Sequence, residues 1–497
     1  MTDLLNRISQ SGPASQTLLQ SGEAAVNRSE LLRRVETLVE HFGRLNLRSI
    51  ALYADNGIEW ILTDLACRVL GMRIVPIPLF FSPEQINHTL SGSGVEALLT
   101  DQDHAGKVID TELEAATQQP FDGSFKLYLL DADPSTLIPD GTQKITFTSG
   151  TTGTPKGVCL SAAQQLAVAD SIATTVGSSS PRHLCVLPLS TLLENLAGVY
   201  SPLISGGTVI VPPLAEVGLA GSSGLDTDTL LKSITTHQPN TMILVPELLN
   251  ALTAAAECGW RPPSSLHFVA VGGGKVSPAL LQRARDAGLP AYEGYGLSEC
   301  ASVVTLNVPG ADRAATVGRP LPHLTVAVDQ GEIVVSGCEF LGYANQPDTW
   351  NQVPVRTGDL GYIDDDGFVV VSGRAKNQLI TSFGRNVSPE WVESELTAGA
   401  LLQQAVVVGD AKPFCVALLC SRDPATTDAE IDELLRTVNL RLPDYARVLD
   451  WYRMPEPNSK ANGLMTENGK PKRAAIEEHY EFGIQHMYAI GREAINQ

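Results

Sequence analysis

A segment rich in glycine, hydroxyl side chains and one lysine carries the clearest chemical signal in the sequence. Residues 145–157 read ITFTSGTTGTPKG, so a β-branched and apolar run leads into hydroxyls, glycines and Lys156. Glycines let backbone N–H groups turn toward a phosphate, hydroxyls donate further hydrogen bonds, and the lysine adds a positive charge. A Walker phosphate loop is excluded, because Lys156 is followed by Gly157 and not by Ser or Thr. The order of residues therefore predicts a phosphate-binding loop rather than a plain turn between strands.

This segment resembles the phosphate loop of the adenylate-forming superfamily, which includes acyl-CoA synthetases, aryl-CoA ligases, peptide-synthetase adenylation domains and luciferases. Further blocks of the superfamily follow in the expected order, so the resemblance covers most of the chain. Residues 75–84 and 187–195 are most similar to the acyl-CoA synthetases of long- and medium-chain acids. The resemblance implies that the loop binds the phosphates of ATP through Thr148, Ser149, Gly150, Thr151, Thr152, Gly153 and Lys156.

Three later blocks resemble the parts of the superfamily that hold the rest of the nucleotide. Glycines after a predicted strand let a flat ring approach the backbone, which implies an adenine site at Gly272, Gly273 and Gly274. Residues 292–299, YEGYGLSE, resemble the YGxTE block and imply that Tyr295 and Gly296 lie near adenine. In the same block Ser298 is expected at the α-phosphate and Glu299 at Mg²⁺, because hard cations prefer oxygen ligands. Asp359, in the block RTGDLGY, is expected to accept hydrogen bonds from both ribose hydroxyls, since a carboxylate has two acceptor oxygens.

The C-terminal blocks resemble the mobile domain of the superfamily. Arg374 is expected to contact ribose or phosphate, and Lys376 stands where the domain rotation is centred. Gly384 is expected on the loop that lines the thiol tunnel in the second conformation. Lys470, in the sequence NGKPKR, is the expected catalytic lysine, because a flexible ammonium can neutralise charge at the α-phosphate and then leave. The expected division is a large AMP-binding domain, residues 1–373, and a small mobile domain, residues 374–497.

One block resembles the lining of the acyl pocket. Residues 187–195 read LPLSTLLEN, and Thr191, Leu192 and Asn195 are the expected lining residues. Many acyl-CoA synthetases carry a histidine where Thr191 stands. Glu194 is not at the position where adenylation domains commonly place the acid that binds an amino group. The identity of the acyl group is therefore left open.

The elements that must position these residues follow from hydrophobic periodicity. Apolar residues spaced by three and four predict helices at 29–42, 59–71 and 83–92, and short apolar runs between them predict strands at 50–53, 73–77 and 97–100. The pattern returns with strands at 184–188, 208–211, 241–245 and 266–271, and with a loop at 212–228. The predicted fold class is α/β: a large N-terminal unit of mixed or parallel sheets flanked by helices, and a small mobile α+β C-terminal domain.

Composition excludes several other classes. The net charge of −20 disfavours general nucleic-acid binding. The eight cysteines form no CxxC and the nine histidines no HExxH, so buried thiols are expected and a dedicated zinc site is unsupported. The most apolar stretch, residues 60–81, is interrupted by Asp64, Arg68 and Arg73, which predicts buried core rather than a membrane span. We expect a cytoplasmic protein that is a monomer or a homodimer.

The resemblance implies ATP-dependent activation of a carboxylic acid to acyl-AMP, followed by transfer to a thiol. A fatty or other apolar acid is the expected substrate, with ATP, Mg²⁺ and coenzyme A as cofactors. One alternative is a ligase that loads the phosphopantetheine arm of an acyl carrier protein, although no carrier domain follows Lys470. Another is a non-catalytic nucleotide-binding homologue, against which the joint presence of Glu299, Asp359, Arg374 and Lys470 argues.

Overall fold

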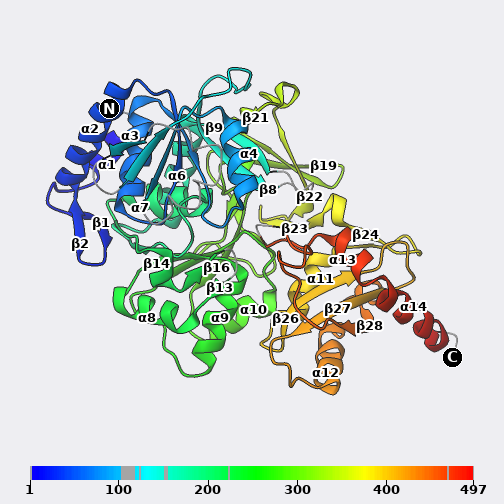
Figure 1. Cartoon of the computed structure of the whole chain (residues 1–497). Coiled ribbons are helices and arrows are strands. Elements are labelled where there is room, and N and C mark those ends of the chain that lie inside the picture. Colours follow the sequence, from blue (N-terminus) through cyan, green and yellow to red (C-terminus); the bar gives the residue numbers. More distant parts are fainter. Residues whose placement is uncertain are drawn as a thin grey trace.

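A mixed sheet covered by helices forms the first part of the chain (Figure 1). The computed structural model describes residues 3–101, 118–121, 125–149, 155–221, 224–466 and 469–495. Among these residues the strands lie, in order across the sheet, as β21 (Gly342–Tyr343), β9 (Pro155–Ser161), β8 (Thr142–Ser149), β4 (Arg73–Pro76), β3 (Ser49–Tyr53), β5 (Ala97–Asp101), β7 (Phe125–Leu129) and β6 (Gln118–Phe121). The central strands β8, β4, β3 and β5 are parallel and the outer pairs are antiparallel.

The helices beside this sheet follow the periodicity of the sequence. Helix α2 (Arg28–Leu45) buries Leu31, Val35, Leu38 and Phe42, and the Asn27 side chain accepts a hydrogen bond from the Glu30 N–H at its first turn. Helices α3 (Ile58–Leu70) and α4 (Pro83–Ser93) join the parallel strands. The three predicted helices and the strands between them are confirmed to within a few residues. Residues 60–81, the most apolar stretch, form buried helix and strand.

A second sheet supplies the strand ends on which two of the expected nucleotide blocks lie. Across the sheet the described strands are β18 (Arg319–Pro320), β17 (Thr305–Leu306), β16 (Ala291–Tyr295), β15 (Phe268–Val271), β14 (Thr241–Leu244), β10 (Arg182–Leu184), β11 (Thr208–Ile210), β1 (Thr17–Ser21) and β2 (Ala24–Asn27). Its helical elements are α1 (Asp3–Gln10), α6 (Ala162–Val176), the π-helix η2 (Leu193–Tyr200), α7 (Ser201–Ile204), α8 (Thr227–His237), α9 (Pro246–Glu257) and α10 (Pro278–Asp286). Strands β15 and β16 are parallel neighbours, so both blocks leave the same edge of the sheet.

Three smaller sheets lie in the later part of the described chain. An antiparallel sheet is formed by β19 (Thr325–Asp329), β20 (Glu332–Ser336), β22 (Val355–Ile363) and β23 (Val369–Arg374). Beyond it lie the short strands β24 (Leu379–Ile380) and β25 (Asn386–Val387) and the sheet of β26 (Leu402–Val408), β27 (Cys415–Ser421) and β28 (Val448–Arg453), with helices α11 (Pro389–Leu396), α12 (Asp428–Asn439), α13 (Arg473–His479) and α14 (Glu481–Ile495). Most buried apolar residues from Leu379 onward form clusters of their own, whereas Ala398 packs in the cluster of the second sheet. Figure 1 shows this C-terminal part beside the second sheet. The α/β fold class is therefore confirmed.

Two local predictions are wrong. The strand predicted at 184–188 ends at Leu184, because the backbone beyond it bonds to side chains: the Leu187 N–H donates to Glu194 and the Leu189 N–H to Asn56. The loop predicted at 212–228 contains the small hairpin of β12 (Leu219–Ala220) and β13 (Gly224–Leu225) and the start of α8. Among the described residues, no helix combines the length and the apolar character needed to cross a bilayer.

Candidate active site

The side chains of Tyr295 and Arg374 both contact the carboxylate of Asp359. The Tyr295 hydroxyl donates to Asp359 Oδ2 at 2.6 Å, and Arg374 Nε lies 2.7 Å from Asp359 Oδ1. The contact with Arg374 is built into the sheet, because Asp359 on β22 stands opposite Arg374 on β23 in the antiparallel register. Each carboxylate oxygen has two lone pairs, so both keep capacity for a further donor such as a hydroxyl of a vicinal diol.

The Asp359 carboxylate is buried but surrounded by partners for its charge. It lies in a residue that is 3% exposed, and burial raises its pKa above the ordinary value. The positive charge of Arg374, the Tyr295 hydrogen bond and the positive charge of Lys470 oppose that rise. The arrangement therefore offers a buried acceptor for donors of a neutral ligand.

The Glu299 carboxylate is held by a residue that the sequence motifs did not indicate. Glu299 lies in a 3₁₀ turn, η4 (Ser298–Cys300), and its Oε1 accepts a hydrogen bond from the Tyr343 hydroxyl at 2.6 Å. The Glu299 backbone carbonyl accepts from Gln164 Nε2 at 2.8 Å. Burial and then the nearby charge of Glu299 raise the pKa of Tyr343. Ser298 precedes Glu299 in this turn and is half-buried. Tyr343 lies 44 residues further along the chain, and no local pattern connects it with Glu299.

Gly296 is required by the packing of the turn that follows it. A Cβ atom at this position would lie 1.4 Å from the Ser302 carbonyl oxygen. Ala301 and Ser302 have φ values of 53° and 88°, the left-handed region that non-glycine residues rarely adopt. The tight turn brings Glu299 back beside β16, so Gly296 serves the geometry of the site.

The glycine loop after β15 presents its backbone beside the same strand end. Gly272 donates its N–H to the Leu244 carbonyl at 3.1 Å, and Gly273 has a φ of +82°. Gly273 and Gly274 are exposed, and a Cβ on Gly274 would lie 3.3 Å from Pro246 Cγ. Lys275 donates to the Val371 carbonyl at 2.8 Å, which ties the loop to β23. The loop therefore leaves open backbone next to the Asp359 group.

The phosphate loop is described only at its two ends. Gly150, Thr151, Thr152 and Gly153 lie outside the described residues, and of Ser149 only the backbone, the end of β8, is described. Thr148 is half-buried and stands opposite Lys156 in the β8–β9 hairpin. Lys156 is exposed, and its Nζ lies 5.1 Å from the centre of the Tyr343 ring. Lys156, at the start of β9, therefore lies beside the tyrosine that contacts Glu299.

Lys470 reaches this group from the small domain. Loss of hydration lowers the pKa of Lys470, the charge of Arg374 lowers it further, and Asp359 and Glu299 oppose the shift. Lys470 is an exposed residue. Lys376 lies in the turn η6 (Ala375–Asn377), where burial, Arg374 and Lys470 lower its pKa. The two lysines and Arg374 therefore concentrate positive charge where an anion would lie.

Other C-terminal contacts fix the small domain against the large one. Ser277 Oγ, at the start of α10, donates to Glu395 Oε1 of α11 at 3.0 Å. Lys460 Nζ lies 3.4 Å from the Phe80 carbonyl oxygen. Gly384, with a φ of +70°, lies in an exposed turn between β24 and β25, and a Cβ there would contact nothing within 4 Å. In this arrangement Lys470, and not Gly384, lies among the site residues.

The expected acyl block is anchored from behind by a buried polar network. Leu192 is 7% exposed, and Thr191 is half-buried with its hydroxyl donating to the Pro188 carbonyl at 2.7 Å. Asn195 donates to Asp64 Oδ2 at 3.0 Å and accepts from Lys144, whose Nζ lies 2.9 Å from Asp64 Oδ1. The Asn195 amide is therefore bonded inside the core, which places Asn195 behind the surface that Thr191 and Leu192 can offer.

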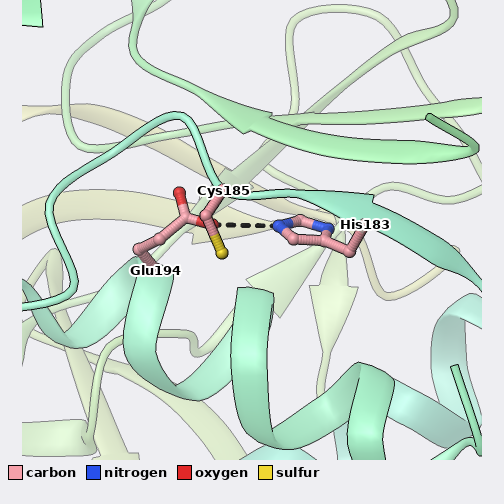
Figure 2. A group of neighbouring side chains, drawn as sticks. All are labelled: His183, Cys185 and Glu194. Carbon is pink, nitrogen blue, oxygen red and sulfur yellow. Dashed lines mark hydrogen bonds and ion pairs between the residues drawn. The ribbon is translucent and has the colours of Figure 1, made fainter. Parts of the chain in front are cut away.

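Figure 2 shows a second buried cluster, His183, Cys185 and Glu194, whose side-chain types could hold a metal. His183 Nε2 lies 2.9 Å from Glu194 Oε1, its Nδ1 lies 2.9 Å from Thr241 Oγ1, and Glu194 Oε2 accepts from the Leu187 N–H at 3.0 Å. A Cβ on Gly198 would lie 2.2 Å from Glu194 Oε1, so the π-helix backbone packs directly on the pair. The pair has its hydrogen bonds satisfied, and we interpret the cluster as an anchor between β10 and η2.

Comparison with known proteins places this geometry in context. Residues 10–343 match the sequence model of the AMP-binding enzyme family, and residues 376–491 match that of the AMP-binding enzyme C-terminal domain. A long-chain-fatty-acid–CoA ligase of Mycobacterium bovis is 27% identical, over 88% of this chain and 88% of the relative. A 2-succinylbenzoate–CoA ligase of Bacillus licheniformis is 29% identical, over 75% of this chain and 78% of the relative.

Solved structures share the fold. An anthranilate CoA ligase in complex with anthranoyl-AMP superposes with a TM-score of 0.79 at 18% identity, over 96% of this chain and 97% of the other. The o-succinylbenzoate coenzyme A synthetase of Bacillus subtilis, in complex with ATP and a magnesium ion, superposes with a TM-score of 0.74 at 23% identity, over 95% and 99%. At these identities the likeness establishes the arrangement of the elements.

Proposed function

This chain belongs to the AMP-binding enzyme family and is an AMP-forming acid–thiol ligase, and from that premise we propose that it converts an apolar carboxylic acid to its coenzyme A thioester. The observation that carries the proposal is the contact of Asp359 with Tyr295 and Arg374, near enough to Lys470 for the charge of that lysine to act on the Asp359 carboxylate. A cation from one domain and the acceptors of the other suit a reaction in which negative charge builds on a phosphate and is then removed.

In the first half-reaction the substrate carboxylate attacks the α-phosphorus of ATP, and the bond to pyrophosphate breaks. We assign Asp359 to the ribose hydroxyls, the backbone at Gly272, Gly273 and Gly274 to adenine, and the ends of the phosphate loop, Thr148 and Lys156, to the phosphates. The Lys470 ammonium donates to the α-phosphate oxygens as their charge increases. The second half-reaction is attack of a thiol on the acyl carbonyl, which releases AMP.

The residues around Glu299 suit a magnesium ion. Magnesium is usually bound through one or two carboxylates together with substrate phosphates and water, and it prefers oxygen ligands. Glu299 supplies one carboxylate, of which Oε1 is occupied by the Tyr343 hydroxyl. When bound, the ion would neutralise phosphate charge during the transfer. Glu299 is therefore the residue that we propose to hold it.

The substrate class and the acceptor rest on the relatives and on the acyl block. The named relatives act on a long-chain fatty acid and on 2-succinylbenzoate, and both are CoA ligases. In the expected acyl block Thr191 is half-buried and Leu192 is buried. We propose a fatty or aromatic acid as substrate and coenzyme A as acceptor. A carrier-protein acceptor and a non-catalytic role have no support among these relatives.

We also propose that the small domain, expected at residues 374–497, moves relative to the large domain between the two half-reactions. Arg374 itself ends β23 and stays with Asp359, so the movement begins after it. Rotation about Lys376 would withdraw Lys470 and bring the turn of Gly384 to the site. The separate apolar clusters of the C-terminal part support such a movement.

The direct test is pyrophosphate release with a panel of long-chain, medium-chain and aromatic acids, each with ATP and magnesium, with and without coenzyme A. We expect release with at least one apolar acid and a thioester only when coenzyme A is present. Lys470→Ala should abolish most of the release, and Lys472→Ala, an exposed neighbour, is the matched control. Absence of release with every acid would contradict the proposed function.

A further inference from the structure

Tyr343 stands at the junction of two parts of the proposed site. Its hydroxyl donates to Glu299 Oε1 at 2.6 Å. Its ring lies under the ammonium of Lys156, with Nζ 5.1 Å from the ring centre, within the range of a cation–π contact. Lys156 belongs to the strand that leaves the phosphate loop, and Glu299 to the turn after β16. One side chain therefore links the phosphate loop to the acidic residue.

The backbone of Tyr343 is fixed by independent contacts. Strand β21 pairs with β9, with Tyr343 opposite Val158. The Tyr343 N–H donates to Thr349 Oγ1 at 3.0 Å, and its carbonyl accepts from the Trp350 indole at 2.9 Å. The Phe340 ring contacts the Tyr343 ring edge-on, with centres 5.3 Å apart. The hydroxyl is thus held in place by the fold, whether or not Glu299 is present.

Apolar packing also joins the same segment to the same turn. The side chains of Cys300 and Cys338 are both buried and belong to the same apolar cluster. Cys300 follows Glu299 directly, and Cys338 lies shortly before Tyr343 in the chain. The turn that carries Glu299 is therefore joined to the 338–343 segment by this packing as well as by the Tyr343 hydrogen bond.

A tyrosine suits this position because its hydroxyl is a neutral donor. A lysine or arginine at the same place would orient the carboxylate but would also cancel its charge. The tyrosine hydroxyl donates to one carboxylate oxygen of Glu299 and restricts the glutamate side chain to one orientation. It leaves the negative charge of the glutamate available to a cation. On this basis, and resting on the function proposed above, we propose that Tyr343 is a positioning residue that holds Glu299 for the divalent cation of MgATP.

The test is calorimetric titration of ATP, without any acid, into the full-length protein at a series of magnesium chloride concentrations and in EDTA. Tyr343→Phe keeps the ring under Lys156 and against Phe340 and removes only the hydroxyl. We expect the ATP affinity of this variant to be reduced about tenfold when magnesium is present, as for other residues that orient a metal ligand, and unchanged in EDTA. Tyr362→Phe, at an exposed tyrosine, is the control and should match the wild type.

Two results would overturn the proposal. Equal affinities of Tyr343→Phe and wild type at every magnesium concentration would show that the hydroxyl does not serve the cation. Equal losses with and without magnesium would show a damaged pocket instead. Glu299→Gln provides a further check, because adding Tyr343→Phe to it should then have no additional effect. Failure of the wild-type protein to bind ATP would contradict the proposed function itself, and this inference with it.

Discussion

Glu293 is a buried carboxyl group whose titration should control stability near neutral pH. It lies on β16 opposite Val271, the residue that precedes the glycine loop, and it is 4% exposed. Burial raises the pKa of Glu293 from 4.5 to about 7, against the charge of Lys275 and a hydrogen bond from the Val276 N–H. The protonated form is therefore favoured in the native protein over a range in which the unfolded chain is ionised.

The sign of the effect follows from proton binding. Between pH 4.5 and about 7 the native state holds the Glu293 proton and the unfolded state does not, so stability decreases as the pH rises through this range. Each pKa unit corresponds to about 1.4 kcal/mol, which makes the full loss about 3 kcal/mol. Glu293→Gln removes the titration, because the amide is neutral at every pH. Its stability relative to wild type should therefore increase by about 2.5 kcal/mol between pH 5 and pH 8, because part of the loss has already occurred at pH 5.

The measurement is urea unfolding of wild type and Glu293→Gln across this pH range, followed by tryptophan fluorescence. The difference between the two proteins matters here, because the other titrating groups are common to both. Glu36→Gln, at an exposed glutamate of α2, is the control and should follow the wild type at every pH. A difference that stays constant with pH, or that increases toward acid, would refute the reasoning.

Four other predictions concern the site and the domain interface. Lys470→Ala should lower pyrophosphate release roughly 10²-fold and spare thioester formation from supplied acyl-AMP, and equal losses in both assays would contradict the assignment. Because the pKa of Lys470 lies below its ordinary value, adenylation should decline with rising pH earlier than for an ordinary lysine, and this alkaline decline should be absent from the pH profile of Lys470→Ala. Glu395→Ala removes the acceptor of the Ser277 hydrogen bond and should reduce adenylation by about fivefold relative to thioester formation, in the same two assays. Gly296→Ala should abolish ATP binding in calorimetry or lower the thermal midpoint, because its Cβ would overlap the Ser302 carbonyl.

Much of the fold could be predicted from the sequence where the signal is local. The spacing of Leu31, Val35, Leu38 and Phe42 predicts α2 correctly, and the alternation of helices with apolar strands predicts the parallel core. The end of β10 could not be predicted, because the backbone N–H groups after it donate hydrogen bonds to the side chains of Glu194 and Asn56. The positions of these two side chains are set by other elements. A prediction from apolar content alone makes this strand too long, because it does not show that the backbone N–H groups of Leu187 and Leu189 bond to side chains.

The site could be predicted from the sequence only as a set of blocks. The motifs indicated Asp359, Tyr295 and Arg374 separately, and the structure brings them together. Their individual roles stay predictions. The motifs could not indicate Tyr343, because its partner Glu299 lies 44 residues away. A single tyrosine also forms no recurring pattern with its neighbours in the sequence. Contacts of this kind depend on how strands pair, which periodicity does not specify.

The hairpin of β22 and β23 bears on what happens to the nucleotide between the two proposed half-reactions. Asp359 stands on one strand and Arg374 ends the other, so the contact proposed for ribose and the start of the small domain share one rigid unit. A rotation that begins beyond Arg374 leaves Asp359 in place. The nucleotide half of an acyl-adenylate would then stay bound at Asp359, while Lys470 leaves the acyl half and the turn of Gly384 takes its place. On the proposed movement, an energy-rich anhydride that water can destroy would be retained between the two steps, and little ATP would be lost to release of an unfinished product.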